Sequence, residues 1–320
     1  MEDQLQYTVF DEYEEPKQAE KDELIDKLQS GNFSLSYSSL AAFSVSPRAF
    51  IAYKLKERKT TKAMILGEAV HCKVLEPAEF KDRYVIAPDV DGTTVAGKNA
   101  WAELYMQLTK DELPTNKQGN YVIPKQEVLI EQVKNMTKKV DPETKKVIFE
   151  GITILPAAVN KDADFRARML VTNRATRAVI DMIGDTEISI DYEFRGIRFT
   201  GRIDGRGSGM IADIKNMPDA TLRAAKFQIQ ARKMHWQAFG YNMATDEHCD
   251  CYILAVDGNG ETSAHRFDDR HLEKAEVEIS EYCDLFMDLV ADSVFDRTVF
   301  DQSQDFWLKN EHNPYGINQL

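Results

Sequence analysis

Two aspartates and a lysine in this chain have types and spacings that could support phosphodiester chemistry. Asp213 and Lys215 lie two apart in the predicted strand 210–215, so their side chains project from the same face. Carboxylate oxygens suit a divalent cation such as Mg²⁺, which can stabilise charge on a phosphate and lower the pKa of an attacking water. A nearby ammonium can orient or deprotonate that water. Together with Asp204, these residues predict metal-dependent cleavage of a phosphodiester.

The segment between the aspartates predicts how they meet. Asp204 ends a predicted strand, residues 205–209 (Gly-Arg-Gly-Ser-Gly) form the connecting turn, and Asp213 lies in the strand that returns beside it. Ile214 points to the opposite face, which leaves its backbone carbonyl as a possible third oxygen ligand. An isolated Asp-x-Lys tripeptide is more often a salt-bridged surface strand. The chemical interpretation therefore depends on other parts of the chain.

Two further pairs of residues support it. His71 lies on a predicted helix, four residues after Gly67. Gln237 and Tyr241 are also four apart, which places an amide and a phenol on one helical face. Taken singly, the first pair is typical of a structural histidine and the second of an ordinary amphipathic helix.

In chain order the four patterns are GxxxH, GxxD, DxK and QxxxY, and together they resemble the PD-(D/E)xK nuclease superfamily, specifically its RecB-like and RecE-like exonuclease branch. Residues 35–43 and the following Ser46-Pro47-Arg48 resemble the opening serine-rich helix and S/C-P-R element of that branch. Residues 97–101 resemble its GK-x-x-W element. The chain departs from the usual PD-(D/E)xK motif at Ile203, which replaces proline, and at Asp213, which replaces glutamate. Both variants occur in the RecB-like branch.

The resemblance implies roles for these residues. Lys215 would position the nucleophile, and Gln237 and Tyr241 would support the site or touch the scissile strand. The cofactor would be Mg²⁺, with Mn²⁺ able to substitute. Four groups would bind the metal: His71, Asp204, Asp213 and the backbone carbonyl of Ile214.

The activity implied by the resemblance is an exodeoxyribonuclease that degrades one strand of linear duplex DNA, 5′→3′, and exposes 3′ single-stranded overhangs for recombination. Metal-held water would attack in line. Relatives in this branch form rings around DNA and work beside a single-strand annealing protein, so a homo-oligomer and such a partner are expected. The acidic ends of the chain are possible docking surfaces.

Other functions stay open at this point. A RecB-like endonuclease or a single-strand nuclease would carry the same motifs. A catalytically silent DNA-end-binding protein would use the same fold without cutting. An acidic interaction protein, such as a DNA mimic, is suggested only by the charge of the two ends.

A 5′-phosphate could be bound by a serine-rich helix start together with an arginine, because helix N-termini bind phosphate readily. The alternative is that a serine here simply caps the helix. The candidates are Ser36, Ser38, Ser39 and Arg48.

The charge is distributed unevenly. The net charge of the 320 residues is −13, yet residues 1–30 hold ten acids and three bases, and residues 268–320 hold thirteen acids and four bases. The segment between them, which carries all four motifs, is therefore basic by about three charges. Its basic clusters could contact phosphates or form solvated helix faces. One such cluster is Arg223, Lys226, Arg232 and Lys233.

Composition narrows the class of protein. With 43% apolar residues, no apolar run of about 20 residues and no basic-then-apolar start, the chain is expected to be soluble and cytoplasmic, without a signal peptide or membrane span. Some RecB-like nucleases hold an iron–sulfur cluster through a cysteine of the C-P-R element, but here that position is Ser46, so no cluster is expected. The four cysteines, expected to be structural thiols, are Cys72, Cys249, Cys251 and Cys283.

The predicted fold is of the α/β (α+β) class, with a restriction-endonuclease-like core in which helices flank a mixed central sheet. Residues 1–32 are expected to form an acidic flexible arm with one short helix near 24–28, residues 33–295 the nuclease domain, and residues 296–320 a tail. Residues 88–150 are a mostly helical insertion, with helices near 101–108 and 125–138. Other helices are predicted at 36–59, 65–80, 161–183, 221–246 and 268–292, and strands at 187–192, 197–203, 210–215, 251–256 and 262–267.

Overall fold

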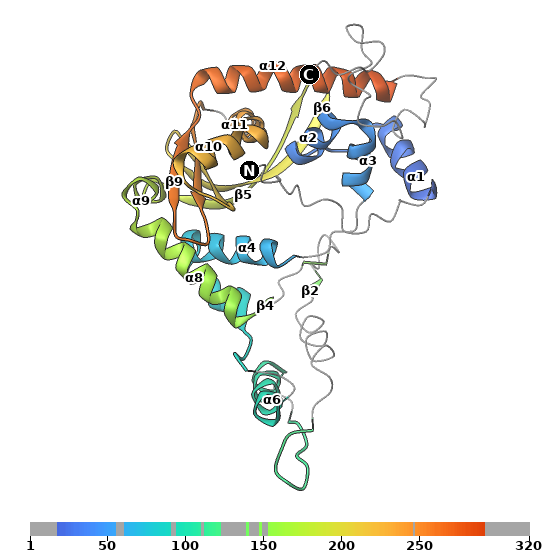
Figure 1. Ribbon diagram of the computed structural model, residues 1–320. Helices are drawn as coiled ribbons and strands as arrows, with labels where there is room; N and C mark the ends of the chain where they lie inside the picture. The colour runs from blue at the N-terminus through green and yellow to red at the C-terminus, as the bar shows by residue number, and fades with distance from the viewer. Residues whose placement is uncertain are drawn as a thin grey trace, which may run out of the picture.

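A five-stranded mixed sheet forms the centre of the protein (Figure 1). The computed structural model describes residues 18–55, 61–90, 94–109, 112–122, 139–140, 147–148, 153–245 and 247–291. The strand order is β5-β6-β7-β8-β9; β7 and β8 are parallel and the other neighbours are antiparallel. The mixed sheet flanked by helices is confirmed. The strands are β5 (Asp185–Phe194), β6 (Ile197–Gly207), β7 (Met210–Asn216), β8 (Asp250–Val256) and β9 (Thr262–Arg266).

Helices cover both faces of this sheet, because successive side chains of a strand point to opposite sides. Ile211 and Ile253 pack into the core of one face, and Ala212 and Leu254 into that of the other. The first face carries α1 (Gln18–Gln29), α2 (Tyr37–Val45), α3 (Pro47–Leu55), α10 (Leu222–Ala231), α11 (Met234–Met243) and α12 (Asp269–Ala291). The second carries α4 (Lys62–Leu75), α8 (Ala157–Thr172) and α9 (Arg174–Ile180).

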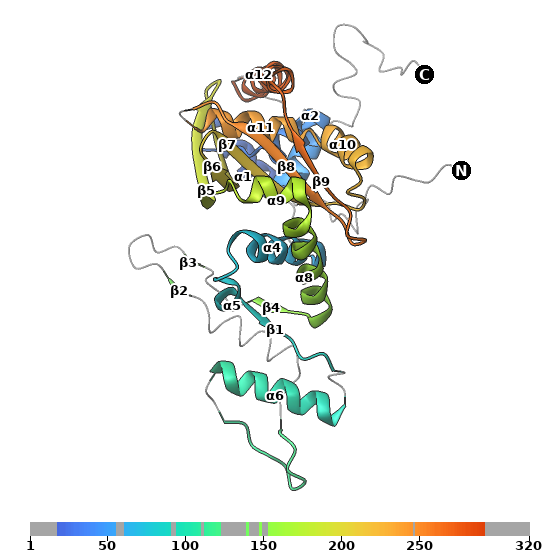
Figure 2. The ribbon, with the colours of Figure 1, turned by 90° about the vertical axis from the view of Figure 1, so that its left-hand side faces the viewer.

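The insertion lies away from the central sheet, with α6 (Val95–Thr109) at the far end (Figure 2). It begins after α5 (Phe80–Arg83). Helix α6 contains the helix predicted near 101–108, whereas the one predicted near 125–138 lies outside the described residues, as does the tail from residue 296. Two small sheets are present here: β1 (Tyr84–Ile86) pairs in parallel with β4 (Thr153–Leu155), and β2 (Lys139–Val140) pairs with β3 (Val147–Ile148).

Two predicted helices are each divided in two by a residue with extended backbone. The prediction of one helix over 36–59 is wrong, because Ser46 precedes Pro47 and proline disfavours the helical conformation of the residue before it. The prediction over 161–183 is wrong because the chain leaves the helix at Asn173, whose side chain then caps α9 by accepting from the backbone N–H of Ala175 at 2.9 Å.

The prediction of one helix over 221–246 is also wrong, and this break affects the site. Lys233 has a φ of 51°, so the chain turns between α10 and α11, and the direction of α11 is independent of α10. The Lys233 Nζ donates to Ser44 Oγ at 2.8 Å and lies 4.2 Å from the centre of the Trp236 ring. Lys233 therefore packs against the protein and does not belong to a solvated phosphate-contacting face.

The N-terminal helix is part of the folded body. The helix expected near 24–28 is α1, and its Ile25 and Leu28 side chains are buried in the same core as the helices around it. Residues 18–29 thus pack against the domain, although they fall within the segment expected to be an arm.

The four cysteines are free, buried thiols. Cys72 lies in the core beneath α4, and the other three lie in the core of the opposite face. In the described part of the chain no helix combines the length and the apolar character needed to cross a bilayer.

Candidate functional site

Strands β6 and β7 pair only near their connecting turn. Their ladder consists of Gly207↔Met210, Arg206↔Ile211 and Gly205↔Ala212, after which β6 continues beside β5 and β7 beside β8. Asp204 and Asp213 are the first residues beyond this ladder. We call the opening between the two strands at Asp204 and Asp213 the strand fork.

The turn itself is shorter than expected. The prediction of a turn over 205–209 is wrong, because β6 continues to Gly207 and β7 begins at Met210. Ser208 and Gly209 make the turn, and Gly209 adopts a φ of 66°, which a residue without a Cβ atom tolerates. Asp204 consequently lies inside a long strand rather than at its end.

Helix α4 brings His71 into the fork. The His71 Nε2 lies 2.7 Å from the backbone oxygen of Ile214, and its Nδ1 lies 3.3 Å from Asp204 Oδ2. The same Asp204 oxygen accepts a hydrogen bond from the backbone N–H of Ile214 at 3.0 Å. These three predicted metal-binding residues are therefore in mutual contact.

Asp213 and Lys215 lie on the other side of β7 from Ile214, as the strand period predicts. The Lys215 Nζ lies 2.5 Å from Asp213 Oδ2. Asp213 is only 3% exposed, and neither of its carboxylate oxygens has a hydrogen bond of normal geometry from the described residues. A buried carboxylate that lacks hydrogen bonds is costly unless a cation offsets its charge.

The pKa shifts follow from burial and neighbouring charge. Burial and the charge of Asp213 raise the pKa of Asp204 well above its usual range. Burial lowers the pKa of His71, which favours the neutral imidazole that metals bind. Burial opposes the charge of Lys215, but Asp213 and Asp204 outweigh it and raise the pKa of this lysine, so Lys215 is an ammonium at neutral pH.

Glu187 belongs to the cluster and was not foreseen from the sequence as a site residue. Ligand atoms of His71, Glu187 and Asp204 all lie within 4.8 Å of one another, close enough to share one metal ion. Glu187 has a φ of 53°, interrupts the pairing of β5 with β6, and lies opposite Asp204. Its Oε2 is 2.6 Å from Arg202 Nε, and burial raises its pKa. The sequence signal that could have indicated Glu187 is its place at the start of predicted strand 187–192, the strand before the one that carries Asp204.

Helix α11 supports the β6 side of the fork. The Tyr241 hydroxyl donates to the backbone oxygen of Arg202 at 2.7 Å and accepts from the Gln237 side-chain amide. Burial raises the pKa of Tyr241, which keeps the hydroxyl protonated as a donor. A Cβ at Gly240 would lie 1.3 Å from the Tyr37 hydroxyl, so only glycine allows α2 to begin this close to α11. Gln237 and Tyr241 thus hold the backbone of β6 in place at Arg202.

Asn216, the last residue of β7, is a second residue near the fork that was not foreseen. Both polar atoms of its side chain are buried and have no hydrogen-bond partner among the described residues. A Cβ at Gly67 would lie 3.8 Å from its Nδ2, an ordinary contact, so the GxxxH glycine faces this amide.

The 5′-phosphate candidates lie at the start of α2 and on α3. Ser36 caps α2: its hydroxyl accepts from the backbone N–H of Ser39, and the Ser39 hydroxyl accepts from that of Ser36. Ser39 is buried, whereas Ser38 and Arg48 are exposed. Leu35 pairs with β6 at Phe199, where β7 no longer pairs with β6. The start of α2 therefore lies beside this free edge of β6.

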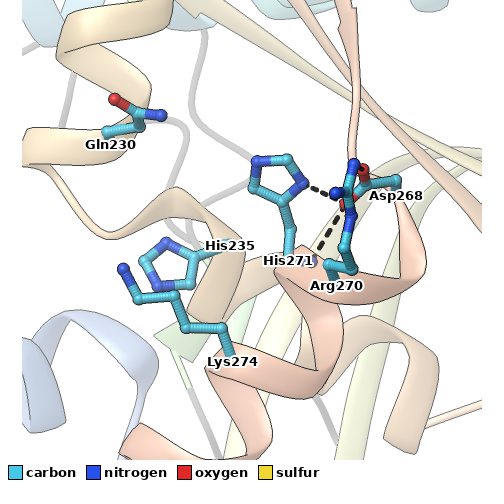
Figure 3. A pocket seen from close by; sticks show the side chains of 6 residues that line it. All are labelled: Gln230, His235, Asp268, Arg270, His271 and Lys274. Carbon is cyan, nitrogen blue, oxygen red and sulfur yellow. Dashed lines mark hydrogen bonds and ion pairs between the residues drawn. The ribbon is translucent and has the colours of Figure 1, made fainter.

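A separate pocket lies elsewhere, at the start of α12 (Figure 3). It measures about 480 Å³ and contains none of the predicted site residues. Asp268 is hydrogen-bonded to Arg270 and His271, and His235 lies 2.9 Å from Glu278. A smaller pocket, whose lining includes Asp213, Gln237 and Tyr241, adjoins the fork. We place the chemistry at the fork, because there the buried Asp204 and Asp213 gather beside His71, and neither Asp213 oxygen has a normal hydrogen bond from the described residues. The larger pocket is lined by Gln230, His235, Asp268, Arg270, His271 and Lys274.

Comparison with known families is consistent with this geometry. Residues 36–293 match the family described as "PDDEXK-like domain of unknown function (DUF3799)". The chain belongs to this family. The PD-(D/E)xK resemblance, the fold class and the assignment as a nuclease are thereby confirmed. PDDEXK nucleases use divalent metals, and this one has a cluster that can hold such an ion.

Two further comparisons add little to the family assignment. A search of curated proteins finds no match for this PDDEXK-like nuclease. Among solved structures, it is similar to a protein from Eubacterium rectale described as a "Putative exonuclease", with 12% identity, a TM-score of 0.48, and coverage of 87% of this chain and 85% of that one.

Proposed function

We propose that this PDDEXK-like nuclease is a Mg²⁺-dependent exodeoxyribonuclease that degrades one strand of linear duplex DNA, 5′→3′, and exposes 3′ overhangs for recombination. The observation that carries the metal-dependent chemistry is the strand fork. There, buried Asp204 and Asp213 lie beside His71 and Lys215, and neither Asp213 oxygen has a normal hydrogen bond from the described residues.

The donor set fits a hard divalent cation. If the His71 Nε2 donates to the Ile214 carbonyl, its Nδ1 presents a lone pair to Asp204 Oδ2, and two acceptors then face each other at 3.3 Å. A divalent cation held between them would resolve this conflict, because carboxylate oxygens and neutral imidazole nitrogens both bind such ions. We propose Asp204, Asp213, the Ile214 carbonyl and His71 as the metal-binding groups, with Glu187 adjacent.

When bound, Mg²⁺ would supply charge stabilisation on the phosphate and a lowered pKa for water. The Lys215 ammonium would donate a hydrogen bond that orients the nucleophilic water, rather than accept its proton. Tyr241 and Gln237 would hold the Arg202 backbone and thereby keep Asp204 in place.

The preference for DNA ends is the finer part of the proposal. Arg48 and Ser38 are the exposed candidates for contact with a 5′-phosphate, while Ser36 and Ser39 shape the helix start that presents them. A ring-shaped homo-oligomer and a single-strand annealing partner complete the proposal, by analogy with RecE-like relatives.

Digestion of linear duplex DNA labelled separately at each 5′ and 3′ end, beside a covalently closed circle, tests this function. We expect loss of 5′ label with an intact circle in Mg²⁺ or Mn²⁺, and no loss in EDTA. Cutting of the circle would assign the protein to the endonuclease class. Degradation of single strands alone would indicate a single-strand nuclease, and binding without cutting a silent end-binder.

A matched pair of ends tests the 5′-phosphate contact. Arg48→Ala should lower the rate on 5′-phosphorylated ends and leave the rate on 5′-hydroxyl ends nearly unchanged, because only the phosphate offers the charge that arginine recognises. Equal losses on both ends would remove this role from Arg48.

A further inference from the structure

Helix α10 buries one face against the sheet and leaves the other open. Ala225 and Ile229 are buried, whereas Leu222 is 68% and Phe227 57% exposed. Phe227 is the one aromatic residue among the exposed large apolar side chains that the structure describes. A single exposed apolar residue is ordinary on a protein surface, so the significance of Phe227 depends on its neighbours.

Those neighbours are cations without carboxylate partners. Arg223 is one helical turn from Phe227 and Lys226 is next to it, and both side chains are exposed. In the part of the chain that the structure describes, neither forms an ion pair. Arg177 and Arg198, by contrast, pair with Asp181 and Asp191. An exposed aromatic ring on the same side of the helix as two unpaired cations is complementary to nucleic acid.

The C-terminal end of α10 lies close to the fork. Met234, two residues beyond Arg232, lines the small pocket at the fork together with Asp213, which places the end of α10 near the fork. Arg223 lies near the opposite end of the helix, about 14 Å from Arg232 along the helix axis. The open face of α10 therefore leads away from the strand fork.

We propose that this open face of α10, formed by Leu222, Arg223, Lys226 and Phe227, binds single-stranded DNA beside the strand fork. Phe227 stacks on a base, and Arg223 and Lys226 bind the flanking phosphates. Bases in an intact duplex stack on each other, so the ring selects a single strand. The helix length corresponds to about four nucleotides. This inference rests on the proposed nuclease function for its link to catalysis.

Binding without metal tests the face separately from cleavage. Fluorescence anisotropy in EDTA would follow a fluorescein-labelled oligo(dT) and a duplex of equal length. We expect Phe227→Ala to weaken oligo(dT) binding about 5- to 100-fold and duplex binding far less, and Phe227→Trp to restore it. Val277→Ala, at an exposed apolar position of α12, is the matched control and should bind as the wild type does.

The contribution of the two cations to binding can be measured separately, through the salt dependence of the oligo(dT) affinity. The double variant Arg223→Ala/Lys226→Ala should reduce the slope of log K against log salt for oligo(dT) by about 1.4, because each single-strand phosphate contact contributes about 0.7. An unchanged slope would show that these cations do not contact phosphates.

Several results would overturn the inference. Wild-type affinity of Phe227→Ala for oligo(dT) would do so, as would equal losses on single strand and duplex. A change of oligomeric state in Phe227→Ala, measured by sedimentation, would show that the face joins copies of this chain. If the wild type cuts no DNA but Phe227 still governs oligo(dT) binding, the proposed function fails and the inference stands. If cutting proceeds and Phe227 has no effect, the inference fails alone.

Discussion

Two aspartates of this nuclease each lie beside a histidine, and their pKa values are shifted in opposite directions. Asp204, in the strand fork, is buried, and burial together with the charge of Asp213 raises its pKa. Asp268, at the start of α12, is only partly buried, and hydrogen bonds from Arg270 and His271 lower its pKa to about 2. The charged form of Asp268 is thus stabilised by its surroundings, whereas the charged form of Asp204 is destabilised by its surroundings.

The difference lies in the charge that each region supplies. Asp268 pairs with the Arg270 guanidinium and caps α12 by accepting from the backbone N–H of His271. The fork brings three carboxylates together with two cations, and the Asp213 oxygens have no normal hydrogen bond from the described residues. A divalent cation is the simplest completion of the fork, whereas the α12 pocket needs none. The fork groups are Asp204, Asp213, Glu187, Lys215 and Arg202.

The largest expected effect separates these regions by activity. Asp213→Asn should lower the cleavage rate about a thousandfold or more, because it would remove a proposed, negatively charged metal ligand worth several kcal/mol in the transition state. Lys215→Ala should show a comparable loss. Asp268→Asn should cut within about twofold of the wild type. Gel assays on linear duplex DNA measure these cleavage rates, and circular dichroism checks that the variants fold. Similar rates for Asp213→Asn and Asp268→Asn would show that the fork and the α12 pocket do not differ in catalytic importance.

Metal should stabilise the fold through the fork alone. At 100 times its dissociation constant, Mg²⁺ contributes about 2.7 kcal/mol, or about 4 °C in melting temperature for a chain of 320 residues. We expect this increase in the wild type and in Asp268→Asn, and little of it in Asp213→Asn. Differential scanning fluorimetry in Mg²⁺ and in EDTA is the measurement. A full increase in Asp213→Asn would place the metal elsewhere.

A smaller effect tests the support that α11 gives to the fork. Tyr241→Phe removes the donor to the Arg202 carbonyl and should cost about 1 kcal/mol of stability, because a partly buried hydrogen bond is lost. The cleavage rate should fall about tenfold as β6 loosens. Urea unfolding and initial rates measure the two effects. If Tyr241→Phe were as inactive as Asp213→Asn, the hydroxyl would act in the chemistry itself.

The opposite pKa shifts predict opposite pH dependences in EDTA, the smallest of these effects. The folded pKa of Asp204 lies above its unfolded value, so its charge destabilises the fold at high pH, and this cost disappears as pH falls through the folded pKa. Asp204→Asn should therefore exceed the wild type in stability at pH 8 and lose that advantage toward pH 4.

For Asp268 the sign reverses. Its folded pKa is about 2, below the unfolded value of about 3.9, so its stabilisation is present above about pH 4 and is lost as pH falls toward 2. Asp268→Asn should be less stable than the wild type at pH 6, with the difference closing near pH 2. Melting curves across pH measure both, and parallel curves for the two variants would mean that the aspartates are equivalent.

Strand periodicity and motif order were sufficient to predict the centre of the fork. Asp213 and Lys215 share a face because they are two apart in a strand, and Ile214 presents its backbone to His71. The break between α10 and α11 was not predictable, because Lys233 adopts a left-handed φ without a glycine or proline to mark it. The break at Ser46 was marked by the proline that follows it.

Glu187 was missed for a different reason. Its place opposite Asp204 depends on the register of β5 with β6 and on an interrupted pairing, and register is set by tertiary contacts that a single sequence does not display. The α12 pocket shows the converse, since its histidines and aspartate could have been taken for a site until their partners were known.

The most direct test of a metal-binding fork is a crystal structure of the protein grown with Mn²⁺ and measured for anomalous scattering. We predict an anomalous peak within about 2.3 Å of oxygens of Asp204 and Asp213, and none at the α12 pocket. A structure with saturating Mn²⁺ and no peak at the fork, or with its peak among Asp268, His271 and His235, would contradict the central claim.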